Sequence, residues 1–418
     1  MIVGVCGQGP IHAHVARAFE TAIWDPSVGA AAFVAKLTRP RTLVVCVEGA
    51  AADEILRALV PQLEPGDLVI HGATEHFQAS RRRAAELEAA GIRYVDVGVG
   101  IGPEASAHGP ALAVGGSLEA FEQARPVLER IAVSIDDRPG VERMGAAGAG
   151  QLVKMLQMGI EYADMHALAE GYDVLHAIGG LTNAELADTF ESWNRGELES
   201  LFVAVTPRIF RNADSLVDLI ADTCGMKPPG KWIVKEAVDA GIAIPAIASS
   251  VEVRLLSAQR PPALAIPATS GSEVMIDDVR RAIYGAKLCT YAQVFALARH
   301  WDIPLAAFAR LGRAGCTIRG AVFAMIERAY QRDPELAYLL LDPEIAGALR
   351  DCEPAWRRVV TLSIQHAIGL PALTASLTAL DTLRRARLPL NLILAQRDLV
   401  GGIAYQRTDR DGAFHTEW

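Results

Sequence analysis

The sequence predicts an α/β Rossmann-like N-terminal domain, then a large all-α domain and a C-terminal tail. Its 418 residues exceed what one hydrophobic core usually holds, so more than one domain is expected. The first part alternates short β-branched runs with helical patterns, whereas helical patterns dominate the remainder up to the last 30 residues. We therefore expect domains at 1–145 and 146–388, followed by a tail at 389–418.

The elements of the first domain can be assigned in order. The runs IVGVCG, TLVVCV, DLVIHG and RYVDVGV are short, apolar and β-branched, which is typical of buried parallel strands. A further strand is expected at AIWDPS, after a short first helix. The segments ADEILRALVPQLE and SRRRAAELEAAG carry apolar residues at helical spacing. This alternation predicts a doubly wound parallel sheet.

Composition excludes several classes of protein. The formal net charge of -9 disfavours a general nucleic-acid binder. We see no apolar run of the roughly 18 residues that a membrane span requires. The six cysteines lack the spacing of a zinc site, so we expect reduced thiols, no metal and a cytoplasmic protein.

A glycine turn follows the first predicted strand. Gly7 and Gly9 match the first two glycines of a dinucleotide fingerprint, but His12 occupies the third position, where we expect its ring between helix and strand. Asp25 lies 18 residues after Gly7, about where a carboxylate binds the ribose of NAD. Two interpretations stay open: a modified nicotinamide site, or a Rossmann scaffold whose pocket has been closed.

The segment GAGQLVKMLQMGIEYADM, residues 148–165, predicts a mostly apolar helix with one cation and one anion. Lys154 and Glu161 are seven residues apart, close to two turns, so they share one face with about 10 Å between their Cα atoms. Burial would lower the pKa of the lysine and make the pair an acid and a base for one small molecule. Taken alone, two charges that reach solvent are the commoner arrangement.

The sequence resembles the 6-phosphogluconate dehydrogenase family over almost its whole length. The matching motifs are the segment at 148–165, SWNRGEL, GKW, RGAV, RDPELAYLLLD, AWRRVV, AQRD and FHTEW. The resemblance implies that Lys154 is the general base and Glu161 the final proton donor of an oxidation followed by decarboxylation. It also implies a homodimer in which the tail of each subunit completes the site of its partner. The implied ligands of the substrate phosphate are Tyr162, Lys227, Arg254 and Arg397.

Several positions depart from the pattern of this family. Its VSGGE loop is written here Val99-Gly100-Ile101-Gly102-Pro103, in which Gly102 is the retained glycine. Polar contacts to the sugar acid are replaced by shorter or apolar groups, and a site that loses such contacts discriminates strongly. We therefore expect a phosphorylated β-hydroxy acid other than 6-phosphogluconate. The other changed positions of the substrate site are Thr74, Gln157, Met158 and Ile403.

The cofactor side also departs. The family reads the 2′-phosphate of NADP with Asn-Arg-Thr, where this chain has Trp24-Asp25-Pro26. Because Asp25 would repel that phosphate, we expect NAD rather than NADP. An alternative is a decarboxylase or isomerase that uses Lys154 and Glu161 with no nicotinamide. A third is a catalytically silent binding protein.

Overall fold

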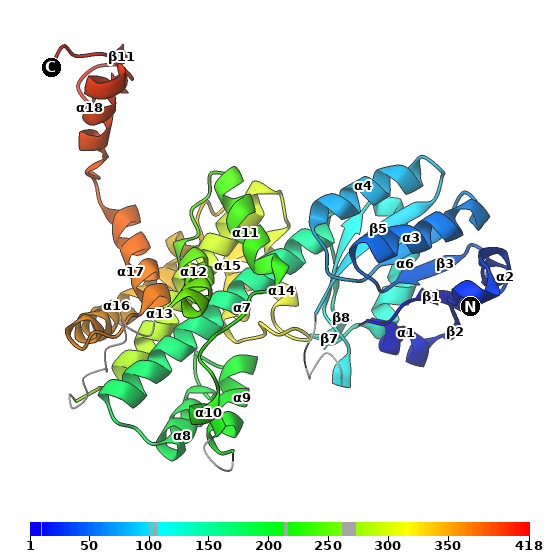
Figure 1. The fold of residues 1–418 in the computed structure, drawn as a ribbon, viewed down its shortest axis with the longest axis horizontal. Helices are drawn as coiled ribbons and strands as arrows, with labels where there is room; N and C mark the ends of the chain where they lie inside the picture. Colours follow the sequence, from blue (N-terminus) through cyan, green and yellow to red (C-terminus); the bar gives the residue numbers. More distant parts are fainter. Residues whose placement is uncertain (10, 101, 103–106, 213–215, 261–272) are drawn as a thin grey trace.

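The computed structural model describes residues 1–9, 11–100, 102, 107–212, 216–260 and 273–418. Figure 1 shows a sheet covered by helices, a helical part built around the long helix α7, and a tail that extends from it. The Rossmann-like domain and the large helical domain are therefore confirmed. The exact boundaries at 145 and 388 stay a prediction.

The N-terminal domain has a seven-stranded sheet in the order β2-β1-β3-β4-β5-β6-β9. The five strands from β2 to β5 are parallel, as the β-branched runs predict. Strand β6 is antiparallel to β5, and β9 is parallel to β6, so the far edge of the sheet is mixed. The strands are β1 (Ile2–Cys6), β2 (Glu20–Ile23), β3 (Thr42–Val45), β4 (Leu68–His71), β5 (Arg93–Val99), β6 (Leu112–Gly116) and β9 (Val141–Gly145).

Alternate residues of the strands enter two cores, one on each face of the sheet. Val44 packs in the core with helices α1 and α6, whereas Leu43 and Val45 pack in the core with α2, α3 and α4. A strand places successive side chains on opposite faces, so a run that is apolar throughout needs helices on both. The helices are α1 (His12–Ala18), α2 (Ala30–Val34), α3 (Gly49–Leu59), α4 (Phe77–Glu88) and α6 (Leu118–Ile131).

Helix α7 (Ala149–Asp173) is the centre of the helical part, and most of its residues are buried. It packs against helices that come from most of the later sequence, including α11, α12, α13 and α17. This explains why α7 is apolar nearly all round. The helices after α7 are α8 (Asn183–Trp193), α9 (Leu201–Phe210), α10 (Leu216–Leu219), α11 (Pro228–Asp239), α12 (Pro245–Gln259), α13 (Ile276–His300), α14 (Leu305–Leu311), α15 (Val322–Arg332), α16 (Pro343–Gln365) and α17 (Pro371–Arg384).

The N-terminus of α7 is fixed directly to the sheet. The carboxylate of Asp96 on β5 accepts hydrogen bonds from the backbone N–H groups of Gly148, at 2.5 Å, and Gln151, at 2.8 Å. These are N–H groups that a helix leaves without internal partners. Burial raises the pKa of Asp96 to about 6, although the same hydrogen bonds oppose the shift. The sheet thus sets the start of the helix that carries Lys154.

The chain ends in α18 (Leu390–Gly401), β10 (Tyr405–Gln406) and β11 (Ala413–Phe414). Figure 1 shows this tail extending away from the helical part beyond α17. Asp398 organises it, because its carboxylate accepts hydrogen bonds from His415, Thr416 and Trp418. Among the residues that the structure describes, no helix is long and apolar enough to cross a membrane.

Candidate active site

Lys154 lies on the buried face of α7, and its side chain is 3% exposed. Its pKa is lowered from 10.5 mainly because burial disfavours the ammonium, and also because Lys227 is near; Glu161 and Cys316 oppose the shift. Lys154 and Glu161 are therefore close enough to interact electrostatically, as their spacing predicts. A lowered pKa makes this buried amine easier to deprotonate than an exposed lysine, as a general base requires.

Glu161 is hydrogen-bonded to a residue that the sequence analysis did not select. Its Oε2 accepts a hydrogen bond of 2.9 Å from the hydroxyl of Thr317. Thr317 lies in the segment between α14 and α15, far from Glu161 in the sequence. The neighbouring Cys316 interacts electrostatically with Lys154. The loop between α14 and α15 thus contacts Glu161 and also lies near Lys154.

Three of the four residues implied for phosphate binding lie together. The hydroxyl of Tyr162 accepts a hydrogen bond of 2.9 Å from the backbone N–H of Lys227, the residue that precedes α11. The guanidinium of Arg254, on α12, lies 4.0 Å above the ring of Tyr162. Two cations beside a phenol suit a phosphate dianion.

His166 is a second residue that the sequence analysis did not select. Its Nε2 lies 3.2 Å from the Nε of Arg254 and accepts the hydrogen bond of that guanidinium. Burial, and then the charge of Arg254, lower the pKa of His166 to about 4. The ring is therefore neutral near pH 7 and can act as the acceptor. His166 is one helical turn beyond Tyr162 on α7, so this spacing could have indicated it.

The other predicted substrate residues lie on α7 itself and in the segments that follow β4 and β5. Thr74 is half-buried in the turn after β4, and Gln151 ties this turn to α7 by accepting from the N–H of Glu75 at 3.1 Å and donating to the C=O of Ala73 at 2.9 Å. Gln157 is 5% exposed on the turn of α7 between Lys154 and Glu161. Gly102 has φ +122, and a Cβ there would lie 3.4 Å from the methyl carbon of Thr317. The structure therefore places Gly102 beside the loop that holds Glu161.

The glycine turn of the N-terminal domain differs in one respect from the prediction. His12 is half-buried at the start of α1, so its ring does not fill the helix–strand contact; the fully buried Ile11 packs there, against Gly72. Gly7 has φ +83, and Gly9 approaches the backbone of Cys46 too closely for a free side chain, as a dinucleotide turn requires. These features fit a nucleotide.

Asp25 lies just beyond β2, after Trp24, and is exposed to solvent. Its Oδ1 accepts a hydrogen bond of 2.8 Å from the backbone N–H of Ser27, and the side chain of Ser27, followed by this N–H, lowers the pKa of the carboxyl. The group is therefore ionised near neutral pH. A carboxylate at the end of this strand fits a ribose diol and repels a 2′-phosphate.

Comparison with known proteins identifies the family. The model of the NAD binding domain of 6-phosphogluconate dehydrogenase matches residues 12–140, and that of its C-terminal domain matches residues 150–418. A chloroplastic, decarboxylating 6-phosphogluconate dehydrogenase of Arabidopsis thaliana is 44% identical over 414 residues, which cover 92% of this chain and 85% of that one. The chain belongs to the 6-phosphogluconate dehydrogenase family.

Two further relatives support this membership. The decarboxylating 6-phosphogluconate dehydrogenase of Synechococcus elongatus is 41% identical over 410 residues, covering 92% of this chain and 87% of that one. The solved structure of Plasmodium falciparum 6-phosphogluconate dehydrogenase, studied with its cofactor NADP+ and its substrate, superposes with a TM-score of 0.94 at 27% identity and covers all of both chains. The chain is thus an oxidoreductase of the 6-phosphogluconate-dehydrogenase type with an NAD(P)-binding domain.

Gly100 stands where the family has a serine, and the structure shows why a side chain is absent. A Cβ at this position would lie 2.0 Å from the carbonyl oxygen of Gly315. That same oxygen accepts a hydrogen bond of 3.0 Å from the N–H of Ala111, so the close approach is built into the fold. The lost hydroxyl cannot be restored without moving the loop. Ile101 and Pro103, which depart from the family in the same segment, lie outside the described residues.

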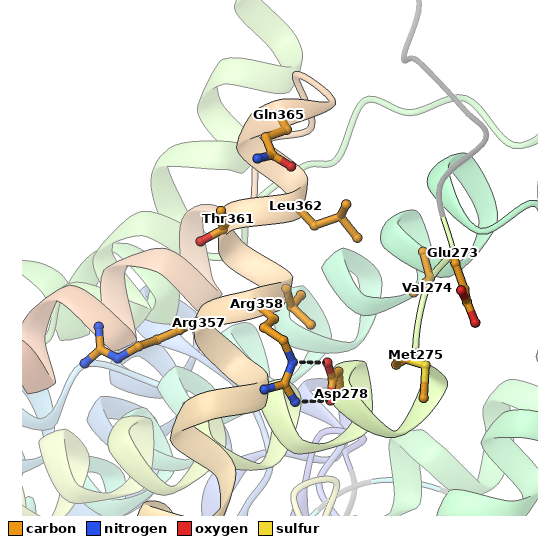
Figure 2. Close-up of a pocket in the computed structure, with 10 residues that line it drawn as sticks. Glu273, Val274, Met275, Asp278, Arg357, Arg358, Thr361, Leu362 and Gln365 are labelled. Carbon is orange, nitrogen blue, oxygen red and sulfur yellow. Dashed lines mark hydrogen bonds and ion pairs between the residues drawn. The ribbon is translucent and has the colours of Figure 1, made fainter.

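Arg397 lies on α18 and is exposed. Figure 1 shows α18 extending away from α7, α11 and α12 of the same subunit. A pocket of about 440 Å³ between the start of α13 and α16 contains other arginines, but their partners are carboxylates. Figure 2 shows Arg358 of this pocket bonded to Asp278. Because no residue of the Lys154 site lines it, this pocket is not a candidate active site.

Proposed function

We propose that this chain catalyses the NAD(P)-dependent oxidation and decarboxylation of a phosphorylated β-hydroxy acid other than 6-phosphogluconate. The observation that carries the proposal is the face of α7. It brings a buried amine with a lowered pKa, a held carboxyl and a phenol with two cations to one side of a single helix. A silent binding protein would have no need for the amine and the carboxyl.

The residues divide the proton transfers between them. The neutral amine of Lys154 takes the proton of the substrate hydroxyl while a hydride leaves the same carbon. A nicotinamide bound to the N-terminal domain would supply the acceptor for that hydride. Loss of CO2 from the resulting β-keto acid gives an enolate, whose oxygen recovers the proton from the Lys154 ammonium. Glu161, in its acid form, then protonates the carbon that lost the carboxylate while the Lys154 amine takes the enol proton, and the phosphorylated ketone leaves.

Tyr162, Lys227 and Arg254 would hold the phosphate of the substrate. The guanidinium of Arg254 is already stacked on Tyr162, and His166 fixes its orientation. Preordered donors lose less conformational entropy when the ligand binds. The phosphate would thus set the register of the substrate along α7, with the reacting carbons near Lys154 and Glu161.

Two features support a substrate other than 6-phosphogluconate. Gly100 has no room for the serine side chain of the family, and Met158, one turn from Lys154 on α7, is a buried apolar residue where the family has asparagine. Both changes remove hydrogen bonds to hydroxyl or carboxylate oxygens. Polar groups of a ligand that lose water in this site without gaining a hydrogen bond weaken its binding. The expected substrate has fewer hydroxyl groups, or an apolar portion at this end.

We expect NAD as the cofactor, because the ionised carboxylate of Asp25 would repel a 2′-phosphate bound near the end of β2. Calorimetric titration of the wild type with NAD and NADP tests this. Tighter binding of NAD supports the expectation, and tighter binding of NADP contradicts it. If neither binds, the decarboxylase or isomerase without nicotinamide becomes the better account.

The reaction is tested with a panel of phosphorylated hydroxy acids that includes 6-phosphogluconate. Formation of reduced nicotinamide is followed for the wild type and for Lys154→Met, which keeps the length of the side chain but removes the amine. We expect another member of the panel to have the higher kcat/KM, and Lys154→Met to be inactive on it. A preference for 6-phosphogluconate would overturn the substrate proposal and leave the reaction type standing.

We also propose a homodimer in which the tail of each subunit carries Arg397 into the phosphate site of its partner. The tail helix α18 supports this, because it exposes large apolar side chains such as Leu392, Leu399 and Val400, at 61%, 62% and 87%. A helix that exposes such residues is expected to bury them against another surface. The wild type should therefore have the mass of a dimer in light scattering.

Subunit mixing tests the shared site. Arg397→Ala and Lys154→Met are each expected to be inactive as homodimers. In a mixed dimer, the Arg397→Ala subunit keeps its own Lys154 and receives Arg397 from its partner. Equal mixing should restore roughly a quarter of wild-type activity, since half the dimers are mixed and each has one complete site. Subunit exchange is verified separately. If activity does not recover although the subunits have exchanged, Arg397 does not act across the interface.

A further inference from the structure

Thr317 is the described residue whose side chain is bonded to the carboxyl of Glu161. Its hydroxyl donates to Oε2 at 2.9 Å, and its methyl group lies beside Gly102. We propose that Thr317 is the positioning residue of the proton donor: it occupies one oxygen of Glu161 and leaves the other to act on the substrate. This inference rests on the proton-donor role proposed above for Glu161.

The loop that carries Thr317 is anchored on both sides. The carbonyl of Gly315 accepts a hydrogen bond from Ala111 at 3.0 Å, and the N–H of Arg319 donates to the carbonyl of Cys316 at 3.3 Å. Farther on, the carbonyl of Arg319 accepts from the N–H of Leu201, at the start of α9. Such anchoring limits how far the Thr317 hydroxyl can move. It therefore restricts the rotation of a long glutamate side chain that would otherwise have many rotamers.

The hydrogen bond from Thr317 decides which oxygen of Glu161 carries the acidic proton. A neutral carboxyl has one protonated oxygen and one carbonyl oxygen. A hydroxyl that donates to Oε2 makes Oε2 the carbonyl oxygen and directs the acidic proton to the other oxygen. The same donor also stabilises Oε2 when Glu161 is ionised after proton transfer. Thr317 can thus serve both states of the acid without rearranging.

The test uses Thr317→Val, which keeps the shape of the side chain but removes the hydroxyl, and Thr317→Ser, which keeps the hydroxyl. Thr206→Val is the matched control, because its hydroxyl donates to the Phe202 carbonyl within α9. The readout is the infrared carboxyl band that Glu161→Gln removes from the spectrum of the purified protein. We expect Thr317→Val to move this band, and Thr317→Ser and Thr206→Val to leave it in place.

An unmoved band in folded Thr317→Val would overturn the inference, and so would a shift as large in Thr206→Val. If Thr317→Val fails to fold, Thr317→Ala and Thr317→Ser provide the same comparison. For the phosphorylated acid that the wild type turns over best, Thr317→Val should lower kcat about ten-fold and change KM little. The infrared measurement needs no substrate. It can therefore support or overturn the role of Thr317 even if the proposed reaction is wrong.

Discussion

A buried ion pair between α7 and α13 offers the sharpest test of how the structure holds its site. Lys287 and Asp164 are 3% and 2% exposed, and the Lys287 Nζ lies 2.5 Å from the Asp164 Oδ2. The hydroxyl of Tyr291 donates to the same oxygen at 3.0 Å. Asp164 follows Tyr162 by two residues on α7. The pair therefore fixes how α7 is rotated against its neighbour.

Asp164→Leu would leave the Lys287 ammonium buried without its anion. Breaking a buried pair by removing one partner costs about 3–5 kcal/mol, because the remaining charge has lost its compensation. In a helical domain of this size, we expect the melting temperature to fall by about 10 °C or more. Lys287→Met should cost a similar amount. The double variant should return to within about 1 kcal/mol of the wild type, since no charge is then left buried.

Urea unfolding, monitored by circular dichroism at one fixed protein concentration, gives the free energy of unfolding of the wild type, the two single variants and the double variant. The reasoning is refuted if either single variant costs less than about 1 kcal/mol, or if the double variant loses the sum of the single losses. Recovery of stability without recovery of activity would show that the pair also sets the position of Tyr162 and Glu161.

Three further outcomes are expected. Lys154→Met should be more stable than the wild type near neutral pH, because the unfolded wild type binds a proton that the folded amine disfavours. The difference in the free energy of unfolding should shrink as the pH rises toward 10.5. Denaturation at several pH values measures this difference, and a constant value would contradict the prediction. Arg254→Lys should raise the substrate KM at least ten-fold with little change in kcat, because lysine lacks the planar fork stacked on Tyr162; an unchanged KM in steady-state kinetics would refute this. Asp96→Asn should lower the free energy of unfolding most below about pH 4 and less above about pH 6. The reason is that the raised pKa of Asp96 means that the folded state favours the protonated acid. The opposite trend in pH-dependent unfolding would show that the carboxylate is the favoured form.

Strands β1, β3, β4 and β5 could be predicted because they are mostly apolar. Strand β2 was expected at AIWDPS but spans Glu20–Ile23, where two polar residues and an edge position weaken the apolar pattern. Strands β6 and β9 were not predicted, for a physical reason. Strand β6 ends in two glycines, and β9 carries Glu142 and Arg143, so neither has the pattern of a buried strand. Strand β6 forms because β5 leaves an unpaired edge, on which β6 pairs in the antiparallel direction. Strand β9 then pairs with β6.

The proximity of Lys154 and Glu161 could be predicted from their spacing on one helix, and their catalytic roles stay a prediction from the family resemblance. Thr317 could not be predicted, because a hydrogen bond across 156 positions of sequence leaves no periodic signal. The buried pair of Asp164 and Lys287 spans 123 positions and is equally hidden. Gly100 was recognised as a departure, but only the coordinates show that Gly315 occupies the space of its missing side chain.

The most direct measurement is the ratio of CO2 released to nicotinamide reduced, determined with the best phosphorylated acid of the panel. If the amine of Lys154 drives oxidation and the β-keto acid then loses its carboxylate, the wild type yields one CO2 for each reduced cofactor and Lys154→Met yields neither. Undiminished turnover by Lys154→Met, or release of CO2 with no cofactor reduced, would contradict the assignment.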